Sequence, residues 1–87
     1  DLGGREDILT RISQYTREEN APATIIVTHH LEEIPTGTTH ILMLKAGKIA
    51  FSGEIAEVLT SESLSQVFGI NVELQIHNER YFATTSL

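Results

Sequence analysis

Residues 23–30 read ATIIVTHH, and the prediction of the fold class starts from this stretch. Its β-branched and aliphatic residues are continuous rather than alternating, which is typical of a strand buried on both faces in a parallel sheet. A helix over residues 4–19 is predicted before it, from apolar residues at helical spacing: Ile8, Leu9, Ile12 and Tyr15. Helix, turn and buried strand make half of an α/β crossover unit. Such a strand needs neighbours on both sides, and the sequence before it contains no second strand of this type.

The second half of the chain is predicted to fold into short local elements. Ala46-Gly47 separates two apolar segments and favours a β-hairpin, and Gly69 marks the end of a short helix. The expected elements are strands over 40–45 and 48–52, short helices over 54–59 and 61–68, and C-terminal strands over 72–76 and 81–83. The predicted fold class is therefore α/β, and residues 1–87 are expected to form one incomplete domain.

Composition and charge exclude several classes of protein. The chain has 87 residues with 6 basic and 12 acidic side chains, and its net charge of -6 argues against a nucleic-acid partner. Cysteine is absent, which excludes disulfides and cysteine-based zinc sites and favours an intracellular protein. No apolar run approaches the roughly 18 residues that a membrane span needs, and residues 1–10 do not resemble a signal peptide. The start at Asp1, without a methionine, suggests a fragment.

The end of the predicted buried strand carries the most informative candidate site. Thr28 and His29 occupy its carboxyl end, which is where open α/β sheets bind ligands. His29 could donate a hydrogen bond to a phosphate oxygen or to water there, and histidine titrates near neutral pH. The alternative interpretation is that His29 and His30 are ordinary surface or capping residues.

A metal site at the two histidines is the weaker hypothesis. His29 and His30 could bind a metal together with Glu32 or Glu33. However, adjacent residues of an extended chain point to opposite faces, and the sequence contains no HExxH motif. No physiological metal site is therefore predicted.

The first residues lead into a helix N-terminus. Asp1, Gly3, Gly4 and Arg5 could hold an anion there or make a tight contact with another chain. A plain helix cap at Asp1 is the simpler interpretation.

In order and spacing, these segments resemble the C-terminal part of an ABC transporter ATP-binding subunit, which has a P-loop NTPase (RecA-like) core. The likeness covers nearly the whole chain and rests on DLGGRE at 1–6, TIIVTHH at 24–30, GKIAFSG at 47–53 and EIAEVLTSESLSQVFG at 54–69. The resemblance implies that Asp1 closes the D-loop and contacts the opposite subunit, with Arg5 at the usual arginine position of the following helix. It implies that His29 is the switch histidine, which binds the γ-phosphate and the attacking water. His30 departs from the aspartate often found next to that histidine, so no role is carried over to it.

Three motifs of the family are absent from these 87 residues. There is no GxxxxGK[ST] loop to cradle phosphates, no LSGGQ-type signature, and no apolar strand ending in Asp-Glu. The resemblance therefore implies that ATP and magnesium are bound mainly by parts missing from this chain. The chain alone is predicted to have no ATPase activity, whereas the intact parent is expected to be an ATPase.

The resemblance also implies partners and a location. The expected partners are a second ATP-binding subunit, in a head-to-tail dimer, and membrane permease subunits that use the hydrolysis of ATP to move a solute. The expected location is cytoplasmic, peripheral on the inner face of the cell membrane. The tail LTSESLSQVFGINVEL, residues 59–74, resembles subunits of importers for metal chelates or molybdate, so import is the expected direction.

Two other functions stay open at this point. The chain could be a stand-alone α/β protein-interaction module, or a small regulatory domain that binds a metal or an anion through His29 and His30. A separate expectation concerns the isolated chain. Its apolar strand, stripped of neighbours, is predicted to drive self-association or domain swapping.

Overall fold

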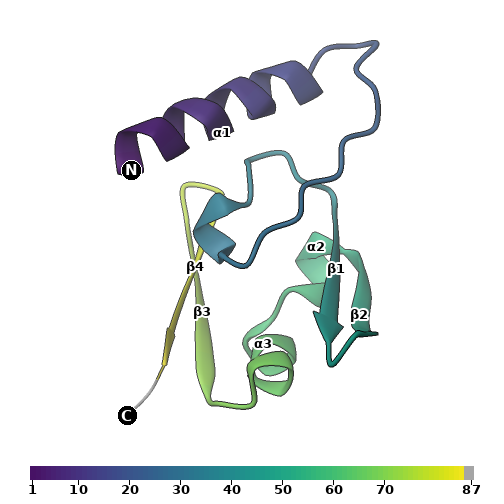
Figure 1. Ribbon diagram of the computed structural model, residues 1–87, viewed down its shortest axis with the longest axis vertical. Helices are drawn as coiled ribbons and strands as arrows, with labels where there is room; N and C mark the ends of the chain where they lie inside the picture. Colours follow the sequence, from purple (N-terminus) through teal and green to yellow (C-terminus); the bar gives the residue numbers. More distant parts are fainter. Residues whose placement is uncertain (86–87) are drawn as a thin grey trace.

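Two antiparallel hairpins and three α-helices make up most of residues 1–85, the part of the chain that a computed structural model describes. In chain order the elements are α1 (Leu2–Thr16), the 3-10 helix η1 (Leu31–Glu33), β1 (His40–Lys45), β2 (Lys48–Glu54), α2 (Ile55–Val58), α3 (Ser61–Phe68), β3 (Val72–His77) and β4 (Arg80–Thr85). Figure 1 shows α1 lying across one end of the molecule, with the hairpins and α3 on one side of it. The predicted α/β class is confirmed.

The first hairpin, β1–β2, forms around a turn whose residues suit it. Ala46 and Gly47 both have positive φ angles, 53° and 76°, which is the backbone signature of turns that match the twist of paired strands. The predicted hairpin is confirmed, and its second strand continues through Gly53. Gly53 has a φ of 150°, and a Cβ there would lie 2.9 Å from Cγ2 of Val58. Glycine is therefore required where β2 passes α2.

Helix α3 is bounded by residues that cap both of its ends. The Thr60 hydroxyl accepts a hydrogen bond from the Ser63 amide at 3.0 Å, and the Ser63 hydroxyl accepts one from the Thr60 amide at 3.1 Å. This capping box satisfies two backbone donors. Gly69 ends the helix in the left-handed conformation, as predicted. The Ser65 hydroxyl then accepts from the Val72 amide at 2.9 Å, which fixes β3 against α3.

The hydrophobic core is assembled from the second half of the chain. Its buried members are Ile34, Met43, Ile55, Leu59, Leu64 and Val72. Partly buried residues pack against this cluster, among them Phe51 of β2 and Tyr81 of β4. Within the described residues, α1 adds no side chain to the cluster, although its Leu9 is buried. The core therefore joins the two hairpins through α2 and α3 and leaves α1 outside.

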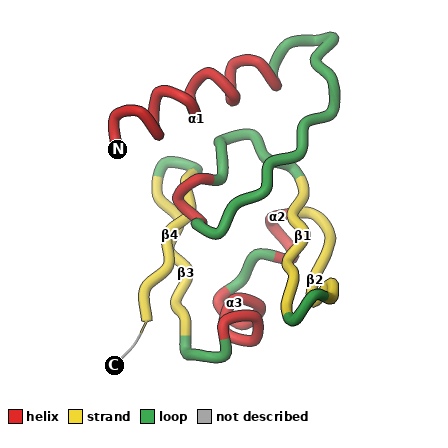
Figure 2. The backbone as a smooth tube through the Cα atoms, viewed as in Figure 1, coloured by secondary structure: helices red, strands yellow, loops and turns green. Residues whose placement is uncertain are grey.

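The predicted buried strand over residues 23–27 does not form. The segment has no regular secondary structure, and Figure 2 shows it as part of the long connection between α1 and η1. Ile25 and Val27 are 92% and 89% exposed. A strand exists only through hydrogen bonds to a neighbouring strand, and in residues 1–85 both two-stranded sheets are formed by other segments. The apolar pattern indicates that residues 23–27 favour a strand. A strand forms only where a neighbouring strand can hydrogen-bond to it.

Helix α1 confirms the predicted N-terminal helix, with shifted ends. It begins at Leu2 and ends at Thr16, so both ends lie earlier than expected. Leu9 of the predicted apolar stripe is buried, whereas Ile8 and Tyr15 are exposed. The rest of the described chain therefore packs against only part of this stripe. No helix in the described part of the chain combines the length and the apolar character needed to cross a membrane.

Replacing Leu64 with alanine should destabilise the fold strongly, because this core side chain is 1% exposed. Removal of a buried leucine costs about 2–5 kcal/mol. Urea unfolding followed by circular dichroism measures the loss. Leu44→Ala is the matched control, since Leu44 of β1 is 59% exposed and its unfolding free energy should change by less than about 0.5 kcal/mol. Equal losses in the two variants would contradict this placement of the core.

Self-association of the isolated chain stays a prediction, and residues 23–27 offer a way to test it. Ile25 and Val27 are two residues apart, so an extended chain presents them on the same side. The double variant Ile25→Lys, Val27→Lys should be more monomeric, because charged side chains disfavour pairing between strand edges. Light scattering over a range of concentrations measures the change. The control pair Leu44→Lys, Ile49→Lys alters exposed residues of the first hairpin, and an equal effect there would exclude a specific role of the segment.

Candidate functional site

Asp1 caps the N-terminus of α1. Its carboxylate oxygen Oδ1 accepts a hydrogen bond from the Gly4 amide at 2.6 Å, and its carbonyl accepts one from the Arg5 amide at 2.9 Å. A Cβ at Gly4 would lie 3.3 Å from Oδ1, so the small residue helps the carboxylate to approach the backbone. The capping interpretation is confirmed, and the residue is exposed at the end of the helix.

His29 is exposed at the end of the extended segment, and the chain turns immediately after it. Thr28 holds this turn. Its hydroxyl oxygen accepts a hydrogen bond from the His30 amide at 3.1 Å, and the hydroxyl donates to Oε1 of Glu33. The backbone on both sides of His29 is thus fixed by Thr28, while the imidazole remains accessible.

Glu33 gathers positive and donor groups around its carboxylate. The hydrogen bond from the Thr28 hydroxyl is the main cause that lowers the pKa of Glu33; burial opposes it, and the neighbouring His30 and Arg5 lower it further. Nε of Arg5 lies 3.7 Å from Oε2 of Glu33. The carboxylate therefore stays ionised where the turn after His29 meets α1.

The charged contact between α1 and η1 brings the two predicted site segments together. Besides Glu33, Arg5 approaches Glu32, with Nη1 at 3.8 Å from Oε1. Arg5 lies one helical turn after Asp1, and Glu32 belongs to the short helix that follows His29. The structure thus places the helix capped by Asp1 against the turn that carries His29.

Arg80, at the start of β4, completes this network from the opposite end of the chain. Its Nη1 donates to Oε1 of Glu6 at 2.7 Å, and its Nη2 donates to Oε2 at 3.1 Å. Nη2 also donates to the carbonyl of Glu32. The Arg80 side chain is 17% exposed, and its pairing with Glu6 raises the pKa of Arg80 and lowers the pKa of Glu6. We call Arg5, Glu6, Glu32, Glu33 and Arg80 the charged network.

Sequence reasoning singled out Asp1, Arg5 and His29 as separate candidates and gave no role to Glu6 or Arg80. Glu6 and Arg80 are 74 residues apart. No local spacing pattern connects an acidic residue of the first helix with an arginine of the last hairpin. The signal that would find this pair is the three-dimensional packing itself.

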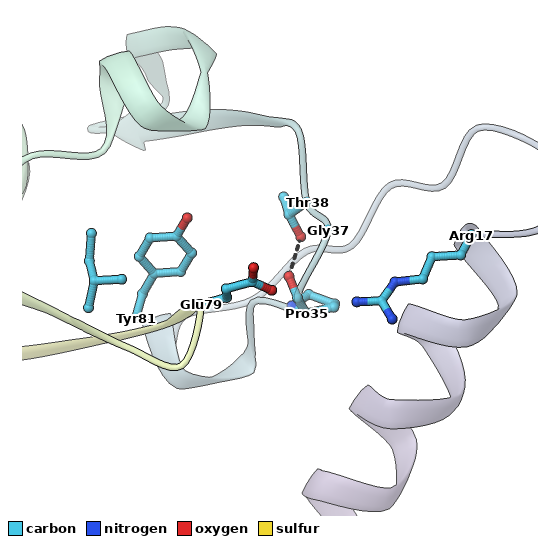
Figure 3. A pocket seen from close by; sticks show the side chains of 7 residues that line it. Arg17, Pro35, Gly37, Thr38, Glu79 and Tyr81 are labelled. Atoms are coloured by element: carbon cyan, nitrogen blue, oxygen red, sulfur yellow. Dashed lines mark hydrogen bonds between the residues drawn. The ribbon is translucent and has the colours of Figure 1, made fainter.

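Cavities beneath α1 do not include the predicted site residues. One of about 340 Å3 is lined by Arg17, Pro35, Gly37, Thr38, Ile76, Glu79 and Tyr81. Figure 3 shows Arg17 approaching it from α1, with Glu79 and Tyr81 on the side of the second hairpin. A smaller one of about 170 Å3 is lined by Leu9, Thr10, Ser13, Gln14, Arg17, Thr36 and Arg80. Neither Asp1 nor His29 lines these two spaces.

Comparison with known proteins decides the family. No family model matches the chain. It is 39% identical over 84 residues to the "uncharacterized ABC transporter ATP-binding protein YlmA" of Bacillus subtilis (strain 168), covering 97% of this chain and 32% of that protein. A putative ABC transporter ATP-binding protein of Streptococcus mutans is 36% identical over 83 residues, covering 94% of this chain and 32% of its own length. The hemin import ATP-binding protein HmuV of Rhodococcus jostii is 34% identical over 77 residues, covering 88% and 26%.

The chain is homologous to the C-terminal part of ABC transporter ATP-binding subunits. The resemblance inferred from the sequence motifs is therefore confirmed. The chain spans about a third of the length of the curated relatives that it matches, 32% for the proteins of Bacillus subtilis and Streptococcus mutans. In this chain the expected switch histidine, His29, is exposed, and the expected D-loop aspartate, Asp1, caps a helix.

The metal-binding alternative at His29 and His30 is not confirmed by the described residues. No group of three or more histidine, cysteine, aspartate or glutamate side chains in residues 1–85 could hold a metal ion. Nδ1 of His30 lies 3.7 Å from Oε1 of Glu32, a single pair rather than a coordination set. The acidic side chains of the turn are instead engaged with Arg5 and Thr28.

The pair Glu6–Arg80 should make the stability of residues 1–87 depend on pH. The pKa of Glu6 is lowered from an ordinary value of 4.5. A group whose pKa is lowered by folding stabilises the fold above its unfolded pKa, and this stabilisation is lost as the pH falls through the folded pKa. The unfolding free energy should therefore be lower for Glu6→Gln than for the wild type at pH 7, and this difference should shrink as the pH falls from 7 towards 3.

Urea unfolding followed by circular dichroism at both pH values measures this difference. Glu57→Gln is the control, because Glu57 is exposed on α2 and outside the charged network. This variant should match the wild type at pH 7. A deficit of Glu6→Gln that persists unchanged at pH 3 would show that the ion pair is not its cause.

Proposed function

We propose that residues 1–87 form the C-terminal portion of an ABC ATP-binding domain and supply its switch histidine and D-loop aspartate. The observation that carries this proposal is the likeness to ABC transporter ATP-binding proteins over 94–97% of the chain. The accessible ring of His29 and the exposed cap at Asp1 support it. The parent protein is proposed to hydrolyse ATP and to use the hydrolysis for solute transport through a membrane permease.

The role proposed for His29 is positioning for phosphoryl transfer. Its imidazole would donate a hydrogen bond to the γ-phosphate and orient the attacking water, because in-line transfer depends on geometry and charge stabilisation more than on covalent chemistry. Thr28 and Glu33 would hold the turn so that the ring keeps one orientation. Most contacts with ATP and Mg²⁺ would come from residues outside this segment, and residues 1–87 alone are proposed to be inactive.

The role proposed for Asp1 is a contact across a head-to-tail dimer of two ATP-binding subunits. The capped end of α1 is exposed, as a cross-subunit contact requires. Arg5 connects the first turn of this helix to the turn after His29. The proposed location is the inner face of the cell membrane, and import is the proposed direction, since one relative is a hemin import protein by name.

Replacing His29 with alanine in the full-length subunit should remove most ATP turnover while nucleotide still binds. Loss of one hydrogen-bond donor to a reacting group typically lowers kcat on the order of 10²-fold to 10³-fold. Phosphate release measures turnover, and calorimetric titration with ATP measures binding. His40→Ala is the matched control, because His40 is an exposed histidine at the start of β1, beside Thr39. Full turnover in the His29 variant would refute the switch assignment.

A further inference from the structure

Arg80 is the side chain that connects the last hairpin with both predicted site segments. Its guanidinium donates two hydrogen bonds to Glu6, at 2.7 and 3.1 Å, and one to the carbonyl of Glu32. It is also the most buried member of the ion pairs in the described chain, at 17% exposure. We propose that Arg80 is a positioning residue, which holds the turn after His29 in place against α1. This inference rests on the proposed function of His29.

The contact with the Glu32 carbonyl is the step that reaches the switch turn. Glu32 lies in the middle of η1, a helix of 3 residues whose N-cap residue makes no side-chain capping bond. Its internal support consists of short-range backbone bonds from Glu33 to His30 and from Ile34 to Leu31, each 3.1 Å. So short an element is easily displaced, and a charge-assisted bond from outside restrains it.

From η1 the restraint passes to His29 through two hydrogen bonds. Glu33, the next residue, accepts a hydrogen bond from the Thr28 hydroxyl, and the Thr28 hydroxyl oxygen accepts one from the His30 amide. His29 lies between these two residues. A shift of Glu32 would therefore displace the backbone that carries the imidazole of His29.

Arg80 is itself fixed by the fold of the hairpin. It pairs with His77 in the register of β3 and β4, directly beside the turn. The turn residues Asn78 and Glu79 both have positive φ, 50° and 60°, which favours one tight geometry. Tyr81, the next residue, packs on the hydrophobic core. The position of Arg80 is thus set by the core, and the switch turn is held relative to it.

The chemistry of the site requires arginine. A planar guanidinium can bind both oxygens of a carboxylate and still donate to a third acceptor, whereas the ammonium of lysine is a compact point charge on a flexible stem. Lysine would keep attraction to Glu6 but would not reproduce the full set of bonds. Arg80→Lys should therefore be intermediate, and Arg80→Met should lose every bond while keeping much of the apolar side-chain length.

The test uses steady-state ATP hydrolysis by the full-length subunit. Misplacement of a reacting group by about 1 Å can cost on the order of 10²-fold in rate, so Arg80→Met should lower kcat at least several-fold with KM for ATP nearly unchanged. Arg80→Lys should restore part of kcat. Glu6→Gln keeps the Glu32 contact and should lower kcat less than Arg80→Met, which separates positioning from mere attachment of α1.

A matched control and a second readout keep the outcome interpretable. Lys45→Met removes another cation that donates to a backbone carbonyl, that of Gln66 at 2.6 Å, and should leave kcat unchanged. Hydrogen exchange should show faster exchange at the amides of residues 30–33 in Arg80→Met. Wild-type kcat and exchange in this variant would overturn the inference, as would equal losses in Arg80→Met and Glu6→Gln. An active His29→Ala would instead overturn the proposed function.

Discussion

The bidentate pair between Glu6 and Arg80 is the interaction on which the arrangement of the molecule depends. The described core leaves α1 outside, so hydrophobic burial alone does not seat this helix. Exposed ion pairs contribute little, but a two-pronged arginine–carboxylate contact with partial burial is both stronger and directional. Its direction matters as much as its strength, because the same guanidinium binds the Glu32 carbonyl and thereby aligns three distant segments.

Residues 23–27 show the limit of a strong local pattern. Five consecutive residues favour an extended backbone, yet the described chain offers them no hydrogen-bonding neighbour. Ile25 and Val27 are exposed, and the chain spans only about a third of the length of the relatives that it matches. The difference between pattern and structure arises because no strand in residues 1–85 pairs with this segment.

Elements that depend on nearby residues could be predicted from the sequence. The turn at Ala46-Gly47 and the end of α3 at Gly69 follow from backbone preferences that act within a few residues. The site was predictable only in part. His29 stood out because it follows an apolar run, whereas Glu6 and Arg80 meet across 74 residues and leave no periodic trace. Polar pairs between residues far apart in the sequence depend on how helices and strands pack together, and a single sequence does not show this packing.

The separation of α1 from the core has a consequence for the order of events during synthesis. Every buried residue of the core cluster falls between Ile34 and Val72, so this unit can collapse through contacts of short sequence separation. Helix α1 is translated before its partner Arg80, which follows Glu6 by 74 residues. Its docking through this pair therefore waits until Arg80 has been translated, and until then its apolar stripe is available to chaperones.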